Sequence, residues 1–129
     1  NRPILSAEQL EQGLQFPRMQ GREVFKHAST RMPASVMEAL KVNGLTTSDI
    51  KVLIPHQANQ RITEMVQKQL GLRDDQVYSN IERYGNTTAA SIPIALDECV
   101  QAGRLQRGDL LVLTAFGSGF TWGSAAIRW

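Results

Sequence analysis

The sequence predicts an α/β domain whose mixed, mostly parallel sheet is covered by helices on both faces. Segments with apolar residues every three or four positions alternate with short apolar runs rich in β-branched residues, which is the pattern of helices alternating with strands. Near the end of the chain, an apolar run, a glycine-containing turn and an alternating segment follow one another, which predicts a final strand pair. A length of 129 residues is enough for one domain with its own core.

The chain divides into a lead-in segment, residues 1–20, and a domain, residues 21–129. Two prolines and a glycine interrupt regular structure in the lead-in, so we expect it to be loosely structured. Ser6, followed closely by acidic and carboxamide residues, is a suitable start for a short helix over 6–12.

Residues 21–43 carry a helical pattern that ends at Asn43 and Gly44, the residue types that best tolerate a left-handed cap. Pro33 lies inside this pattern and removes a helical hydrogen bond, so we expect a kink or two abutting helices. Residues 51–55, "KVLIP", then read as a short strand. Its proline belongs at the strand end because it cannot donate to a sheet ladder.

Two further helices and three further strands are expected after this strand. The helices are predicted at 57–70, ending before Gly71, and at 87–102, and the strands at 76–81, at 110–116 and toward Trp129. The helix over 87–102 is unusual because the stretch 86–96 holds no charged residue. Such a helix is buried all round, so something besides the sheet must cover its outer side.

The composition is that of an ordinary globular protein, with 42% hydrophobic and 20% charged residues. A formal net charge of +2 gives no general argument for nucleic-acid binding. No apolar run approaches the length of a membrane-spanning helix, and no signal-peptide pattern opens the chain. The single cysteine, Cys99, excludes an internal disulfide and favours a cytoplasmic location.

Two side chains follow strands at the sheet edge where α/β proteins bind ligands. His56 comes directly after the strand 51–55, and Asn86 follows the strand 76–81 and a glycine-containing loop. From position alone, His56 has about equal chances of a structural and a functional role. Asn86 could be a helix N-cap or a functional amide donor. If the two meet, an imidazole N–H and an amide N–H would form an oxyanion hole, not a nucleophile–base pair.

The remaining candidates carry less chemistry. Cys99 lies deep in a helix, where a buried structural thiol is the commoner case, and His27 reads as a boundary residue. Two histidines and one cysteine at no regular spacing do not support a metal site. Arg61 and Lys68 project from the same side of the helix 57–70, either as a solvated surface or as a cationic strip for a phosphate or an acidic partner.

Four segments together resemble the β-ketoacyl-acyl carrier protein synthase III family, the condensing enzymes that start bacterial type II fatty acid synthesis. The segments are "GREVFKHA", "IPHQANQRI", "ERYGNTTAASIPIALDE" and "LLVLTAFGSGFTWGSAAIRW". The resemblance implies one half of a thiolase-like, five-layer αβαβα fold, in which central helices lie between two sheets. It covers residues 21–129, so we expect the chain to be the C-terminal half of such an enzyme.

The resemblance also implies the roles of particular residues. His56 and Asn86 match two of the family's three catalytic residues, and the third, a nucleophilic cysteine of the N-terminal half, has no match here. Asn59 matches a residue that borders the pantetheine channel. Phe116 matches an aromatic residue of the active site, and Ser118 stands in the glycine loop where the family has glycine, still offering a backbone N–H.

The substrates and partners implied are an acyl-coenzyme A primer, malonyl-acyl carrier protein, the N-terminal half of the same enzyme and a second copy in a homodimer. No cofactor, metal, nucleic acid or membrane is implied. Arg61 and Lys68 match basic residues that dock the carrier protein, whereas Gln69 stands where the family often has a lysine. Two alternatives stay open: a non-catalytic module that binds coenzyme A or the carrier protein, and a related condensing enzyme of secondary metabolism.

Overall fold

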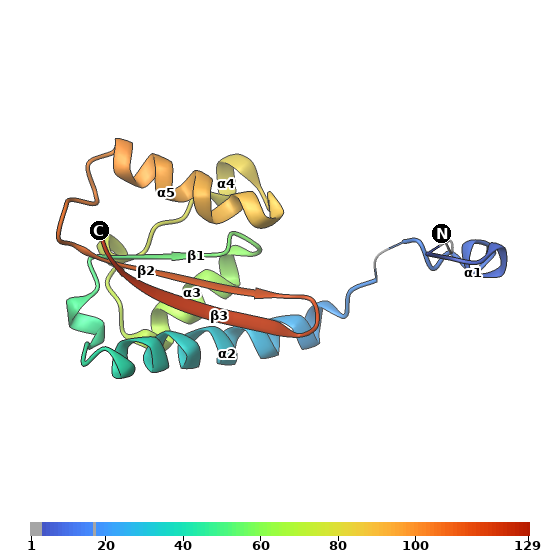
Figure 1. Ribbon diagram of the computed structural model, residues 1–129, viewed down its shortest axis with the longest axis horizontal. Coiled ribbons are helices and arrows are strands. Elements are labelled where there is room, and N and C mark those ends of the chain that lie inside the picture. The colour runs from blue at the N-terminus through green and yellow to red at the C-terminus, as the bar shows by residue number, and fades with distance from the viewer. Residues whose placement is uncertain (1–3, 17) are drawn as a thin grey trace.

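A three-stranded mixed sheet lies between two layers of helices (Figure 1). The computed structural model describes residues 4–16 and 18–129. Its strands are β1 (Val52–Pro55), β2 (Leu110–Gly117) and β3 (Thr121–Arg128). Its helices are α1 (Ala7–Glu11), α2 (Gly21–Val42), α3 (Gln60–Leu70), α4 (Ile81–Tyr84) and α5 (Ser91–Gln101), and its 3-10 turns are η1 (Thr47–Asp49), η2 (Asp74–Gln76) and η3 (Thr88–Ala90).

The sheet is mixed, as predicted, in the order β1-β2-β3. β1 runs parallel to β2, with Val52 opposite Leu111, and β2 pairs antiparallel with β3 through a short turn. The predicted strand over 76–81 was wrong, because this segment contributes only a single parallel bridge between Val77 and Leu53. The chain leaves the sheet there because η2 precedes the bridge and α4 begins shortly after it.

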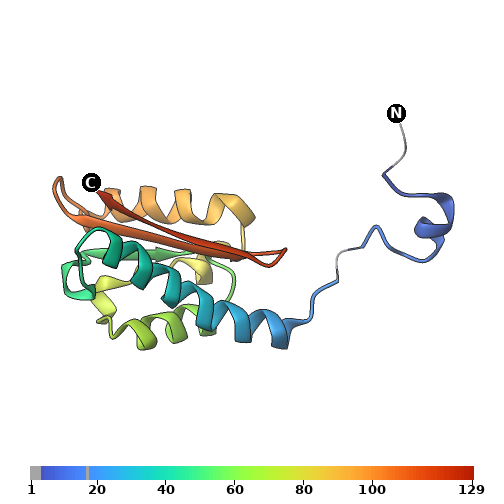
Figure 2. The same ribbon diagram turned by 60° about the horizontal axis from the view of Figure 1, so that its bottom comes forward.

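Successive strand residues bury their side chains on opposite faces of the sheet, as a period of two requires. Leu53 and Val112 pack into the core with α2 and α3, whereas Val52, Ile54 and Leu111 pack into the core with α5. The helices therefore cover both faces, which confirms the predicted layer arrangement (Figure 2).

α2 is one continuous helix through Pro33, so the expectation of two abutting helices was wrong. Met32, Val36 and Leu40 are each buried against the sheet on the helix face that also carries Pro33. This burial offsets the hydrogen bond that the proline removes, because tertiary packing overrides a local preference of this size. The helix ends at Val42, as its pattern predicted.

Two helices begin later than the sequence predicted. α3 begins at Gln60 and not at residue 57, because the Asn59 side chain accepts from the Arg61 N–H at 2.9 Å and so caps the helix. It ends at Gly71, whose φ of 65° is the left-handed cap expected of glycine. α5 begins at Ser91, because residues 88–90 form the 3-10 turn η3.

α5 is covered by the sheet on one side only. Ser91, Ala95 and Cys99 are buried beneath it, whereas Ala89 and Pro93 are exposed. The outer side of this uncharged segment is therefore open within this chain, as expected if a further part of a larger fold covers it.

The lead-in segment carries α1 and extends away from the layered body (Figure 1). Ser6 caps α1, and a reciprocal bond from its backbone N–H to the Gln9 side chain completes a capping box, which confirms the predicted helix start. Residues 1–3 and 17 of the lead-in lie outside the described residues. Within the described part of the chain, every helix is too short or too polar to cross a bilayer.

The open side of α5 predicts that this chain by itself binds a hydrophobic dye and self-associates. We expect sedimentation velocity to show dimers or larger species, together with enhanced fluorescence of the bound dye. Pro93→Lys should lower the dye signal because it places a charge in the middle of the open side. The matched control Gln101→Lys, at the polar end of the same helix, should not. A monomer that binds no dye would contradict this.

Candidate active site

His56 is held at the carboxyl end of β1 by continuation of the sheet. Its backbone N–H donates to the carbonyl oxygen of Thr114 on β2 at 2.8 Å, one step beyond the last paired residue, Pro55. The imidazole is half-buried. Phe116 lies farther along β2, so the sheet itself brings both rings to the same edge, as the sequence predicted.

Asn86 reaches the same edge from the loop between α4 and α5. Gly85, with φ of 66°, turns the chain out of α4. The Asn86 Oδ1 atom accepts from the backbone N–H of Thr88 at 2.9 Å, and Thr88 holds a left-handed φ of 53° that a β-branched residue rarely adopts. With Oδ1 occupied, the Nδ2 amide group of Asn86 remains as a hydrogen-bond donor.

His56 and Asn86 line the same two adjoining cavities. One has a volume of ≈ 670 Å³ and is bounded by Ser91, Phe116 and Trp122 in addition to these two residues. The second has a volume of ≈ 690 Å³ and extends from the same pair toward the start of α2. The two side chains that the sequence placed at one sheet edge therefore face a shared space.

Ser91 fixes the tautomer of the His56 ring. The His56 Nδ1 atom lies 2.6 Å from the Ser91 hydroxyl oxygen, and Ser91 is 2% exposed. The same oxygen accepts from the Gln57 backbone N–H at 3.3 Å. Because the Ser91 oxygen already accepts from Gln57, we assign the Ser91 hydroxyl as the donor to Nδ1 and the ring proton to Nε2.

Burial lowers the pKa of His56 below its ordinary 6.5. The imidazole is therefore neutral at pH 7, with Nδ1 as acceptor and Nε2 as donor. A neutral N–H donor suits the stabilisation of a developing negative charge, because it needs no proton transfer to act.

The other predicted residues divide between the cavities and the surface. Phe116 and Ser118 line both cavities. Asn59 caps α3 and does not line either one, although Ala58 beside it does. Arg61 and Lys68 are exposed on α3.

Cys99 is fully buried, and desolvation raises the pKa of its thiol, which keeps it in its unreactive form. In the described part of the chain, no three side chains of the metal-binding types gather at one place.

Ser91 is the residue of this site that the sequence reasoning missed. It lies four and eight positions before Ala95 and Cys99, which share its buried side of α5. A hydroxyl on the sheet-facing side of a helix, at the end nearest a candidate histidine, is the signal that could have found it.

The family model for the C-terminal part of 3-oxoacyl-[acyl-carrier-protein (ACP)] synthase III matches residues 40–129. These residues include His56, Asn86 and Phe116, the side chains that meet at the sheet edge. The chain belongs to this family.

Individual members are similar along most of this chain. β-Ketoacyl-[acyl-carrier-protein] synthase III of Roseiflexus sp. (strain RS-1) is 54% identical over 122 residues, which cover 95% of this chain and 37% of that protein. The crystal structure of 3-oxoacyl-(acyl carrier protein) synthase III from Pseudomonas aeruginosa PAO1 matches 98% of this chain and 40% of its own, with a TM-score of 0.89 and 46% identity. The synthase III structure from Aquifex aeolicus VF5 matches with a TM-score of 0.85 and 45% identity, covering 87% of this chain and 36% of its own.

The chain thus spans 37% of the length of a curated synthase III relative, and corresponds to its C-terminal part. The α/β arrangement is that of a part of the thiolase-like fold, as the resemblance implied.

We predict that Ser91→Ala allows both tautomers of neutral His56. In the unchanged protein, ¹⁵N NMR should show a proton on Nε2 alone, with titration below 6.5. In Ser91→Ala the two ring nitrogens should share the proton. Ser124→Ala removes a hydroxyl from another, half-buried network, in which β3 bonds α2 and β2, and should leave the His56 signals unchanged. An unaltered tautomer in Ser91→Ala would contradict this assignment.

Proposed function

We propose that this chain supplies the oxyanion-stabilising part of a β-ketoacyl-acyl carrier protein synthase III, which condenses an acyl primer with malonyl-acyl carrier protein. One observation carries the proposal. His56 and Asn86 line one cavity, and each has its acceptor atom engaged, by Ser91 and by the Thr88 N–H respectively. Each therefore offers an N–H donor to that space, and a pair of donors is an oxyanion hole.

The proposed reaction begins outside this chain. An acyl group passes from coenzyme A to a cysteine in the N-terminal half of the synthase, and the coenzyme A thiol leaves. Cys99 cannot take that part because it is buried and its thiol is unreactive.

In the second step the malonyl thioester loses carbon dioxide. The bond between the carboxylate carbon and the central carbon breaks, and its electron pair forms a C=C bond to the thioester carbon. The carbonyl π pair moves onto the thioester oxygen, which gives an enolate. His56 Nε2–H and Asn86 Nδ2–H donate to that oxygen and lower the barrier by stabilising its charge. The enolate carbon then attacks the acyl-cysteine carbonyl, the cysteine thiolate leaves, and a 3-oxoacyl thioester remains on the carrier protein.

Other residues would serve the substrates of this reaction. Phe116 and Ser118 border the cavities in which the thioester would lie. Ala58 lines the second cavity, and Asn59, the next residue, would border the pantetheine arm of the substrate. Arg61 and Lys68 would dock the acidic carrier protein. The proposed enzyme uses no metal or other cofactor, acts as a homodimer and is located in the cytoplasm.

Replacement of either donor should slow decarboxylation far more than acylation. In the complete synthase, Asn86→Asp and His56→Ala should each lower the rate of malonyl-acyl carrier protein decarboxylation by about 10²–10³-fold, the usual effect of losing one oxyanion donor. Acyl transfer from acyl-coenzyme A should stay nearly unchanged, because no enolate forms in that step.

The 129-residue chain by itself should give no condensation product from acyl-coenzyme A and malonyl-acyl carrier protein, because its one thiol is inert. Product formation by this chain would contradict the proposal. So would a complete synthase in which both variants decarboxylate normally, a result that would favour a binding module.

Charge reversal on α3 should weaken recognition of the carrier protein. Arg61→Glu and Lys68→Glu should each raise KM for malonyl-acyl carrier protein by about tenfold, with kcat unchanged, because a surface contact acts equally on ground and transition states. The effect should shrink in high salt and be absent with malonyl-coenzyme A. Lys41→Glu, an exposed lysine at the end of α2, is the matched control. Equal effects of all three changes would count against docking on α3.

A further inference from the structure

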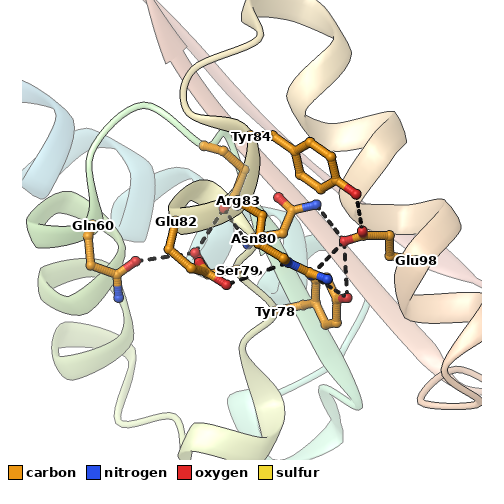
Figure 3. Close-up of polar contacts among 9 residues, drawn as sticks. Gln60, Tyr78, Ser79, Asn80, Glu82, Arg83, Tyr84 and Glu98 are labelled. Carbon is orange, nitrogen blue, oxygen red and sulfur yellow. Dashed lines mark hydrogen bonds and ion pairs between the residues drawn. The ribbon is translucent and has the colours of Figure 1, made fainter.

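The carboxylate of Glu98 on α5 gathers donors from the loop that leads to Asn86 (Figure 3). Tyr84 donates its hydroxyl to Oε1 at 2.6 Å, while the Arg83 guanidinium and the Asn80 side-chain amide donate to Oε2 at 2.7 and 2.8 Å. The Tyr78 hydroxyl lies farther away, at 3.4 Å. The Glu98 side chain is only 19% exposed, whereas its partners Arg83 and Tyr84 are about half exposed.

A second set of contacts joins the same loop to the residues that flank His56. Gln57, which is 1% exposed, accepts from the Asn80 backbone N–H at 3.0 Å and from the Ser79 hydroxyl at 2.8 Å through Oε1. Its Nε2 group donates to the carbonyl oxygen of Pro55 at 2.7 Å. Gln57 therefore connects the end of β1, at Pro55, to the loop residues Ser79 and Asn80.

The two sets meet at Asn80, which is 2% exposed. Its backbone bonds Gln57, next to His56, and its side chain bonds Glu98, which in turn holds Tyr84, two residues before Asn86. Hydrogen bonds between Gln57 and Asn80, between Asn80 and Glu98 and between Glu98 and Tyr84 therefore connect the chain segments that carry His56 and Asn86.

The loop has few other restraints. α4 is a single turn of four residues, and the Asn80 side chain does not cap it, because that side chain is used on Glu98. None of the residues of α4 is buried. Apolar packing therefore contributes little to its position, and the polar contacts must set where Asn86 stands.

We propose that Glu98 is a positioning residue that sets the separation of the His56 and Asn86 donors by holding Tyr84, Arg83 and Asn80. The inference rests on the proposed function, because it concerns the same oxyanion hole. Hydrogen bonds from Tyr84 and Asn80 lower the pKa of Glu98, so its carboxylate is ionised at neutral pH. The bond to Glu98 also raises the pKa of Tyr84, which keeps the phenol protonated as a donor.

The test compares two half-reactions in the complete synthase that contains this chain. Glu98→Gln keeps the size of the side chain but removes the charge and one acceptor atom. It should lower kcat for malonyl-acyl carrier protein decarboxylation by about tenfold, since small misplacements of catalytic groups have effects of this order or larger. KM and the rate of acyl transfer from acyl-coenzyme A should not change, because neither depends on the spacing of the two donors.

Two further variants keep the test decisive. Tyr84→Phe removes a single exposed hydroxyl without risk to folding, and should lower kcat for decarboxylation less than Glu98→Gln does. In the double variant the two reductions should not add, since both changes act on the same contact. Asp97→Asn makes the same change of charge one residue away, where the carboxylate bonds only Gln101 within the described contacts, and should have no effect.

The outcomes separate this inference from the proposed function. Equal losses in decarboxylation and acyl transfer would show a general loss of structure and overturn the positioning role, as would a Glu98→Gln enzyme that behaves like Asp97→Asn. If His56→Ala and Asn86→Asp also left decarboxylation intact, the proposed function itself would fail. If those two variants are impaired and Glu98→Gln is not, only the positioning role is lost.

Discussion

The parallel pairing of β1 with β2 is the constraint on which the rest of the site depends. Four residue pairs set the register, from Val52 opposite Leu111 to Pro55 opposite Thr114. Pro55 has no N–H, yet the ladder resumes at once with the bond from His56 to Thr114. A slip by one residue would turn every β1 side chain to the other face and separate His56 from Phe116. The apolar cores on both faces of the sheet therefore also fix the place of the imidazole.

Hydrogen bonding then decides what the side chains at this edge can do. Both His56 and Asn86 have a hydrogen-bond donor and an acceptor, so each could in principle either donate to a substrate oxygen or accept a hydrogen bond from a substrate group. Ser91 and the backbone of Thr88 engage the acceptor atoms, and burial keeps the imidazole neutral. The two neutral donors proposed here are suited to holding a negative oxygen. Ser91 and Glu98, both on α5, hold the two sides of that site from the same helix.

Local patterns were sufficient to predict most of the fold. The apolar runs located β1 and β2, glycine marked the end of α3, and the layers on both faces followed from the alternation of helices and strands. The failures have side-chain causes. α3 starts late because Asn59 caps it, the segment 76–81 leaves the sheet for α4, and α2 passes through Pro33 because its core face is buried.

The site was predictable only in part for a related reason. The place of His56 follows directly from the strand before it, whereas Asn86 was predicted from a strand over 76–81 that the structure does not have, and family resemblance indicated the roles of both. The partners of these residues come from contacts between distant segments: Ser91 lies 35 residues from His56, and Glu98 lies 14 from Tyr84 and 18 from Asn80. Periodicity describes neighbours on one element, so it cannot pair an acceptor on α5 with donors in a loop.

In the proposed mechanism, His56 and Asn86 donate together to one oxygen. A crystal structure of the complete synthase with an unreactive malonyl thioester analogue tests it most directly. The thioester carbonyl oxygen should lie about 2.7–3.1 Å from both His56 Nε2 and Asn86 Nδ2, with Ser91 still bonded to Nδ1. A carbonyl oxygen that contacts only one of the two nitrogens, or a His56 ring that presents Nδ1 to it, would contradict the proposed oxyanion hole.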